Sequence, residues 1–214
     1  MQLYRLAASA CLALLLGACS TVYYDTLEQF GVHKREILVD RVEDARASQV
    51  DAAEQFTTAL EKFRSVVDFD GGDLERLYND LNRELERSES KAAKVTDRID
   101  AIEDVAGALF REWEGELDQY SSESLRAQSR RQLEDTRGRY DEMLGAMRRA
   151  EARIAPALAP FADQVLFLKH NLNAQAIASL RGEVAVIEAD VESLISELEA
   201  AIAAADQFIS TDAA

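Results

Sequence analysis

The stretch from Ile177 to Leu198, IASLRGEVAVIEADVESLISEL, decides the fold of this chain. Its apolar residues recur at alternating intervals of three and four positions, which is the spacing of one face of an α-helix and not of a strand. This row of positions, hereafter the seam, consists of Ile177, Leu180, Val184, Ile187, Val191, Leu194 and Leu198. A second apolar flank at seven-residue spacing consists of Ile195, Ile202 and Ile209. A stripe of this width is typical of a multi-helix bundle.

The same spacing recurs in the chain before this stretch. Together the seams predict helices over about residues 33–67, 73–119, 122–170 and 174–209. The turns between them are predicted at 68–73, where glycines follow Asp70 and Asp73 caps the next helix, at Ser121 and Ser122, and at 171–173. Pro156 and Pro160 fall inside the third helix. Because no capping residue stands directly before Pro156, we expect a kink there and not a new helix.

Four long helices joined by short turns pack as antiparallel neighbours. We therefore expect an all-α fold, an elongated antiparallel four-helix bundle with coiled-coil packing, as a single domain over 26–214. At about 1.5 Å per residue the second helix alone is about 70 Å long. The expected molecule is a rod.

The first residues resemble a bacterial lipoprotein signal. Arg5 precedes an apolar run that is too short to cross a bilayer, since a transmembrane helix needs about 20 apolar residues. The string Leu16-Gly17-Ala18-Cys19 resembles a lipobox. That resemblance implies transfer of a diacylglyceryl group to the Cys19 thiol, cleavage before Cys19 and acylation of the new terminus. We expect a signal-peptide helix at 1–18 and a lipidated tether at 19–25; an ordinary secretory signal cut elsewhere is the alternative.

The net charge and the cysteine content argue against several classes of function. The formal net charge is −16, and removal of Arg5 with the signal makes it −17. Such a chain repels phosphate, which argues against nucleic acid, and it also argues against a polybasic mode of membrane binding, so the lipid must supply the anchor. The two cysteines are Cys11, inside the signal, and Cys19. The mature chain therefore has no free thiol for chemistry and no disulfide.

The third helix is the one that is not acidic. It carries a row of arginines in its first two thirds, namely Arg126, Arg130, Arg131, Arg137, Arg139, Arg148, Arg149 and Arg153. One interpretation is a docking stripe for an anionic partner such as lipid headgroups or a cell-wall polymer. The other is pairing with the acidic flanks of the neighbouring helices. Arg126, Arg130 and Arg137 are the candidate interaction residues of this row.

No catalytic or metal-binding constellation stands out. His33 and His170 are the two histidines, and the bundle places them at opposite ends of the rod, so they cannot share a metal or a catalytic centre. His170 is expected to favour the C-terminus of its helix, where a cation is stabilised. The acids around Asp68 resemble the start of a calcium loop, but the glycine is misplaced and position twelve is Asn79. We expect no enzyme activity, no metal and no cofactor besides the lipid on Cys19.

One core feature is unusual. Gln49, Ser88, Pro156 and Val191 are expected at similar heights on the four helices, with alanines beside them. This predicts a thin core layer. Its role is either to specify register, as a buried polar residue does in coiled coils, or to form a small ligand cavity.

Three strings, VHKREILVDRV at 32–42, FDGGDL at 69–74 and VLFLKHNLN at 165–173, resemble those of a domain-of-unknown-function family of Gram-negative envelope lipoproteins. The resemblance implies a secreted, coiled-coil-rich lipoprotein and no assigned reaction. It also suggests the rod ends, with His33 and His170, as places where a partner could be met.

The sequence thus favours a non-enzymatic, lipid-anchored structural or interaction protein of the cell envelope. Ser20 after the cysteine resembles outer-membrane sorting patterns, so we expect the protein at the outer membrane, facing the periplasm, with an envelope protein as partner. The alternative is a module that binds a lipid or small ligand, in the core layer or on the arginine row. Whether a second copy covers part of the apolar stripe stays open.

Overall fold

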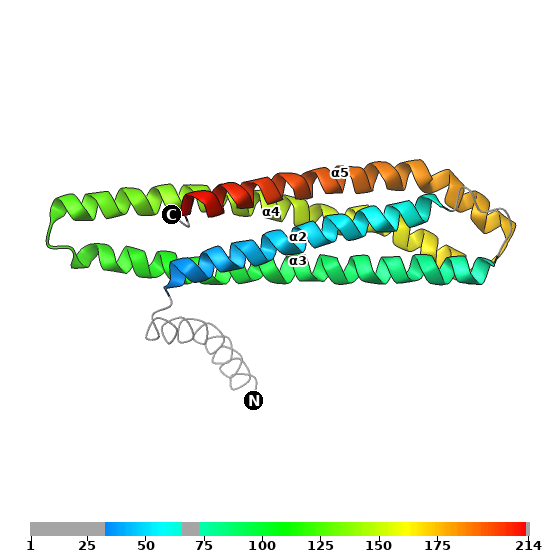
Figure 1. Ribbon diagram of the computed structural model, residues 1–214, viewed down its shortest axis with the longest axis horizontal. Helices are drawn as coiled ribbons and strands as arrows, with labels where there is room; N and C mark the ends of the chain where they lie inside the picture. The colour runs from blue at the N-terminus through cyan, green and yellow to red at the C-terminus, as the bar shows by residue number, and fades with distance from the viewer. Residues whose placement is uncertain (1–32, 66–72, 213–214) are drawn as a thin grey trace, which may run out of the picture.

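The computed structural model describes residues 33–65 and 73–212. Within these ranges the elements are α2, Lys34–Arg64; α3, Leu74–Glu116; a short 3-10 helix η1, Leu117–Gln119; α4, Glu123–His170; and α5, Ala174–Asp212 (Figure 1). The described residues contain no strand, and the all-α prediction is confirmed. The signal peptide, Cys19, the tether and the turn residues Asp68 and Asp70 lie outside the described residues.

Local sequence explains where the helices begin. The Asp73 carboxylate accepts a hydrogen bond from the Arg76 amide at 3.1 Å, and the Ser122 hydroxyl accepts one from the Leu125 amide at 3.4 Å. Each side chain satisfies an amide that has no partner inside the helix. The predicted caps are therefore confirmed. Helix α4 also continues through Pro156 and Pro160 as one element, as expected.

The seams form the core. In α2 each seam position from Leu38 to Phe63 is buried, and in α5 the seam is buried except for the half-buried Val184. The second flank of α5 is half-buried. Helix α2 packs against α3 and α5, and α4 packs against α3 and α5, so the four helices enclose one common core.

The seam of the third predicted helix runs from Leu125 to Leu172, which predicts both residues in the core, but both are exposed. Leu125 is 53% exposed and Leu172 is 44% exposed. Leu125 lies at the start of α4, beyond the ends of α2 and α5, and Leu172 lies in the turn after His170. At both positions a neighbouring helix that would cover the side chain is missing among the described residues. The three-four spacing identifies an apolar face, but it does not say where the partner helix ends.

Helices α3 and α4 extend beyond their neighbours. The first residue of α2, Lys34, pairs with Glu112 of α3 at 3.0 Å, and the last residue of α5, Asp212, pairs with Arg139 of α4 at 2.7 Å. Past these contacts, residues 114–135 form a two-helix projection that we call the hairpin tip (Figure 1). Its α4 arm, from 123 to 135, is about 20 Å long at about 1.5 Å per residue.

Candidate functional site

The hairpin tip is held together by contacts between its two arms. The indole Nε1 of Trp113, at its base, donates to the Ser129 hydroxyl at 2.9 Å. Leu117 is buried at 7% exposure. The Arg126 guanidinium donates to the Tyr120 carbonyl at 2.8 Å and so bridges the turn. These contacts order a hairpin that lacks the covering helices of the main bundle.

Three arginines of α4 meet carboxylates: Arg137 bonds Glu114 at 2.8 Å and lies over the Phe110 ring, Arg139 bonds Asp212, and Arg148 bonds three acids. Farther along the helix, Arg153 donates to the Ser193 hydroxyl, and Arg149 forms no ion pair with a described residue. Arg126, Arg130 and Arg131 of the hairpin tip form no ion pair with any described residue. Pairing with neighbouring acids therefore describes Arg137, Arg139 and Arg148, and it does not describe Arg149 or the three arginines of the tip.

Arg148 is the most densely paired arginine of this row. Its guanidinium bonds Asp100 at 2.6 Å, Glu151 at 2.7 Å and also Glu103. Burial alone would lower its pKa, but the hydrogen bonds with the three carboxylates raise the pKa above the ordinary value. Arg148 is thus a fixed cation that joins α3 to α4.

The two histidines lie at opposite ends of the bundle. His33 occupies the N-cap position of α2 without a side-chain capping bond, and His170 is the last residue of α4. Lys169 and His170 both lie in the last turn of α4, where positive charge meets the negative end of the helix dipole. The described residues contain no group of three or more side chains that could hold a metal ion.

The predicted core layer is only partly present. Gln49 and Ser88 are fully buried, and the Ser88 hydroxyl donates to the Glu84 carbonyl at 2.8 Å. Pro156, however, is exposed on α4, and Val191 lines a near-closed space of about 10 Å³ with Phe63 and Phe161. The four residues therefore do not surround one internal cavity. Val191 thus lies beside the aromatic side chains of α2 and α4.

Gln49 is a buried amide in the core of the bundle. Within residues 33–65 and 73–212, neither its side-chain nitrogen nor its oxygen has a hydrogen-bond partner. An unpaired buried amide costs about 1–3 kcal/mol in proteins. Its apolar neighbours along the α2 seam, Ala45 and Ala52, are fully buried.

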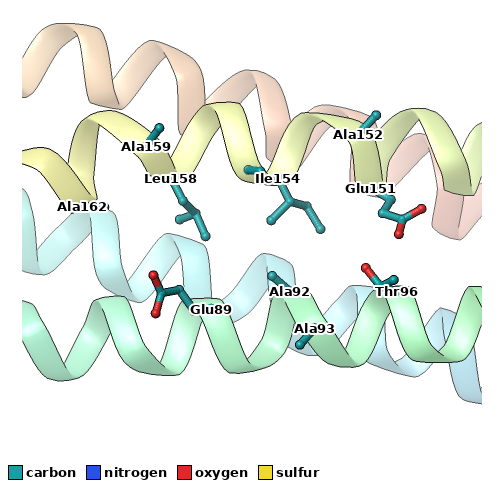
Figure 2. A pocket seen from close by; sticks show the side chains of 11 residues that line it. Glu89, Ala92, Ala93, Thr96, Glu151, Ala152, Ile154, Leu158, Ala159 and Ala162 are labelled. Carbon is teal, nitrogen blue, oxygen red and sulfur yellow. The ribbon is translucent and has the colours of Figure 1, made fainter.

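A groove of about 530 Å³ lies at the surface between α3 and α4, near the height of the expected layer. Its walls are mostly small and apolar: Ala92, Ala93 and Thr96 of α3, and Ala152, Ile154, Ala155, Leu158, Ala159 and Ala162 of α4, with Glu89 and Glu151 also lining it. Figure 2 shows Ile154 and Leu158 reaching from α4 toward Ala92. This groove lies at the surface, and none of the four residues of the expected core layer lines it.

A pattern in the sequence of α4 corresponds to this groove, but it lies beside the apolar seam and is less evident than the seam. Ala152, Ala155, Ala159 and Ala162 repeat at intervals of three, four and three on a face of α4 beside the seam. No long side chain projects from this face of α4 to fill the space toward α3. In the part of the chain that is described, no helix is long and apolar enough to cross a membrane.

Comparison with known proteins identifies one family. A family model described as "Protein of unknown function (DUF2959)" matches residues 23–211. No curated protein matches the chain, and no solved structure matches it. The match covers all four helices of the bundle almost to the end of α5.

Proposed function

The chain belongs to the DUF2959 family, and from that premise we propose that it is a lipid-anchored, non-catalytic interaction protein of the bacterial cell envelope. The observation that carries the proposal is the string Leu16-Gly17-Ala18-Cys19, which follows an apolar run of signal length. Two or three acyl chains on Cys19 would give a stable anchor, because one chain alone binds a membrane only marginally.

The rod shape supports an interaction role. The outer faces of this acidic bundle carry exposed, charged side chains, which offer long surfaces for contact. The placement of Ser20 after the cysteine favours the outer membrane, with the bundle in the periplasm and an envelope protein as partner.

The anchor is tested by substitution of Cys19. The wild-type protein should incorporate a palmitate analogue and fractionate with the outer membrane, whereas Cys19→Ser should lose the label and become soluble. Cys11→Ser, which lies inside the signal, is the matched control and should keep both properties. A Cys19→Ser protein that stays in the membrane fraction would contradict the proposal.

A second candidate function is binding of a single alkyl chain in the groove between α3 and α4. The groove favours it because its volume of about 530 Å³ falls in the range of about 300–1,000 Å³ that is typical of ligand sites. Its alanine-rich walls also leave room for a narrow apolar ligand.

The test uses a fluorescent polyene fatty acid and the soluble Cys19→Ser protein. Saturable binding should disappear in Ala155→Trp, which fills the groove, and persist in Ala203→Trp on the exposed face of α5. Equal binding by both variants would exclude the groove as the site.

A further inference from the structure

We propose that the outer face of α4 is a dimer interface, on which a second copy of this chain packs antiparallel about a two-fold axis beside Pro156. The proposal is independent of the lipid anchor and of the alkyl-binding groove, which lies along one edge of this face. The residues at the centre of the face, hereafter the outer row, are Arg149, Ala152, Pro156, Ala159, Asp163 and Leu166.

The outer row lies on the side of α4 that faces away from the core. Its members follow one another at intervals of three, four, three, four and three, so they share one face of the helix. Figure 2 shows Ala152 and Ala159 on the side of α4 away from Ala92 of α3. Helices α3 and α5 pack on α4 from the sides, and all six residues of the outer row stay exposed.

The outer face is apolar for a chain in which 30% of the residues are charged. Between 152 and 168 the charged residues are Arg153 and Asp163. Leu166 is 57% exposed and Phe167 is 40% exposed. Large apolar side chains that gather on a surface in this way indicate a site of protein contact.

The apolar face extends onto α5. The Arg153 guanidinium donates to the Ser193 hydroxyl at 3.1 Å, which fixes the relative height of the two antiparallel helices. Seven residues from that contact along each helix, toward the turn between them, Pro160 and Val186 lie at one height. Val186 is 51% exposed. The face is therefore two helices wide at this height.

The charges on this face suit an antiparallel second copy. Arg149 and Arg153 lie on one side of Pro156, and Asp163 of α4 and Glu183 of α5 lie on the other. None of these four side chains forms an ion pair with a residue that the structure describes. Arg149 and Asp163 are each seven residues from Pro156, so the axis brings Arg149 of one copy to the height of Asp163 of the other. The same contact forms twice, as an isologous interface requires.

The sizes of the side chains also match across the axis. Ala152, Pro156 and Ala159 are short, so two helices can approach to the about 8–10 Å of close packing. Leu166 lies ten residues from Pro156, and Gly145, which has no side chain to oppose it, lies eleven residues away on the other side. From 145 to 167 the face is about 33 Å long and, across two helices, about 20 Å wide. This is on the order of 650 Å² per copy, near the about 800 Å² per partner of a standard interface.

Acids flank the face, so the apolar contacts must outweigh some repulsion. Glu89 of α3 lines the groove at one edge, and Asp190 lies on α5 between Val186 and Ser193. The whole chain has a net charge of −16. Two copies therefore repel at long range, but this repulsion is largely screened beyond about 8 Å at physiological ionic strength. We expect the apolar contacts to supply the affinity and the charge pairs to fix the antiparallel direction.

The first experiment is disulfide crosslinking of a full chain that carries Cys11→Ser and Cys19→Ser and so has no thiol. Pro156→Cys puts a thiol on the two-fold axis and should give a covalent dimer on mild oxidation, since a disulfide needs Cα atoms within about 7 Å. Leu166→Cys lies about 30 Å from its own copy in the antiparallel dimer and should stay uncrosslinked. Ser90→Cys, on an exposed face of α3, is the control for random collision.

Sedimentation equilibrium of the thiol-free chain measures the affinity. Arg149→Asp places like charges opposite each other at two contacts and should weaken the dimer about tenfold. Arg149→Asp with Asp163→Arg restores opposite charges and should recover the affinity, whereas Arg131→Asp on the hairpin tip, the matched control, should leave it unchanged. Circular dichroism checks that each variant is folded.

A chain that stays monomeric over the whole concentration range would overturn the proposal. Crosslinking at position 156 that does not exceed crosslinking at position 90 would do the same. Equal crosslinking at positions 156 and 166 is the result for a parallel pair and would overturn the antiparallel arrangement, as would a double charge variant that binds as weakly as Arg149→Asp.

Discussion

Asp212, the last helical residue of α5, accepts two hydrogen bonds from the guanidinium of Arg139 in α4, at 3.0 and 2.7 Å. The Asp212 side chain is 2% exposed, and Arg35 of α2 approaches the same carboxylate at 3.6 Å. One carboxylate thus joins the end of α5 to both neighbouring helices. These hydrogen bonds raise the pKa of Arg139 against the lowering effect of burial.

Replacement of Asp212 by Asn should therefore destabilise the bundle. The variant loses the charge that compensates Arg139, and hydrogen bonds to charged groups are worth about 1.5–3 kcal/mol each. We expect the free energy of unfolding to fall by about 2 kcal/mol in urea titrations followed by circular dichroism. Asp206→Asn breaks the exposed pair with Arg46 and should cost less than about 1 kcal/mol. Equal losses in the two variants would mean that Asp212 has no special role.

Replacement of Gln49 by Met should stabilise the protein. The amide is fully buried and has no hydrogen bond with any residue that the structure describes, and Met has similar length without a polar group to desolvate. We expect a gain of about 1 kcal/mol in the same titrations. If Gln49 specifies register, the variant should in addition populate more than one species in size-exclusion chromatography. A loss of stability would indicate that the amide is satisfied by a buried water.

Tyr140 gives a prediction for alkaline pH. Burial raises the pKa of its hydroxyl to about 12, with further contributions from Glu103 and Asp141. In the unfolded chain the group ionises near pH 10. Because the folded pKa is the higher one, the stabilisation is fully present below about pH 10 and is lost as pH rises toward about 12.

Between pH 9 and pH 11 the free energy of unfolding should therefore fall by about 1 kcal/mol less in Tyr140→Phe than in the wild type. Unfolding in urea at each pH measures this difference. Tyr78→Phe, on half-buried Tyr78 of α3, is the control and should follow the wild-type pH dependence. Parallel curves for wild type and Tyr140→Phe would contradict the assigned pKa.

The sequence predicts the interior of this bundle better than its edges. The heptad spacing correctly identifies the seam positions between Leu38 and Phe63 and between Ile177 and Leu198 as the core face. This succeeds because α2 and α5 have neighbouring helices along these stretches. It places Leu125 in the core wrongly, because the spacing carries no information about where α2 and α5 end. The signal for the projection is the difference in helix length: α3 and α4 have 43 and 48 residues, and α2 and α5 have 31 and 39.

The groove and the Asp212 contact escape sequence reasoning for a different reason. Alanines at 152, 155, 159 and 162 are compatible with a close helix contact or with an open groove, and only the separation of α3 and α4 decides between them. Asp212 is one of 40 acids, and its burial depends on the height at which α5 ends beside Arg139. Both features are set by the relative positions of helices.

The hairpin tip should be the part of the described bundle with the weakest hydrogen-exchange protection. Only two helices pack there, so each arm has one covered face and less buried apolar area than α3 and α4 have in the main bundle. Segments with little buried area open locally at a lower free energy than the core.

Trp113→Phe removes the bond to Ser129 and should lower tip protection about tenfold further, since a hydrogen bond is worth about 1 kcal/mol and some ring contact is lost with it. Amides around Ile99 in the core of α3 should keep their protection in the variant. Mass spectrometry of exchanged peptides measures both regions in one sample, and a loss of protection that is equal at Ile99 and in the tip would show that Trp113 stabilises the whole bundle and not the hairpin.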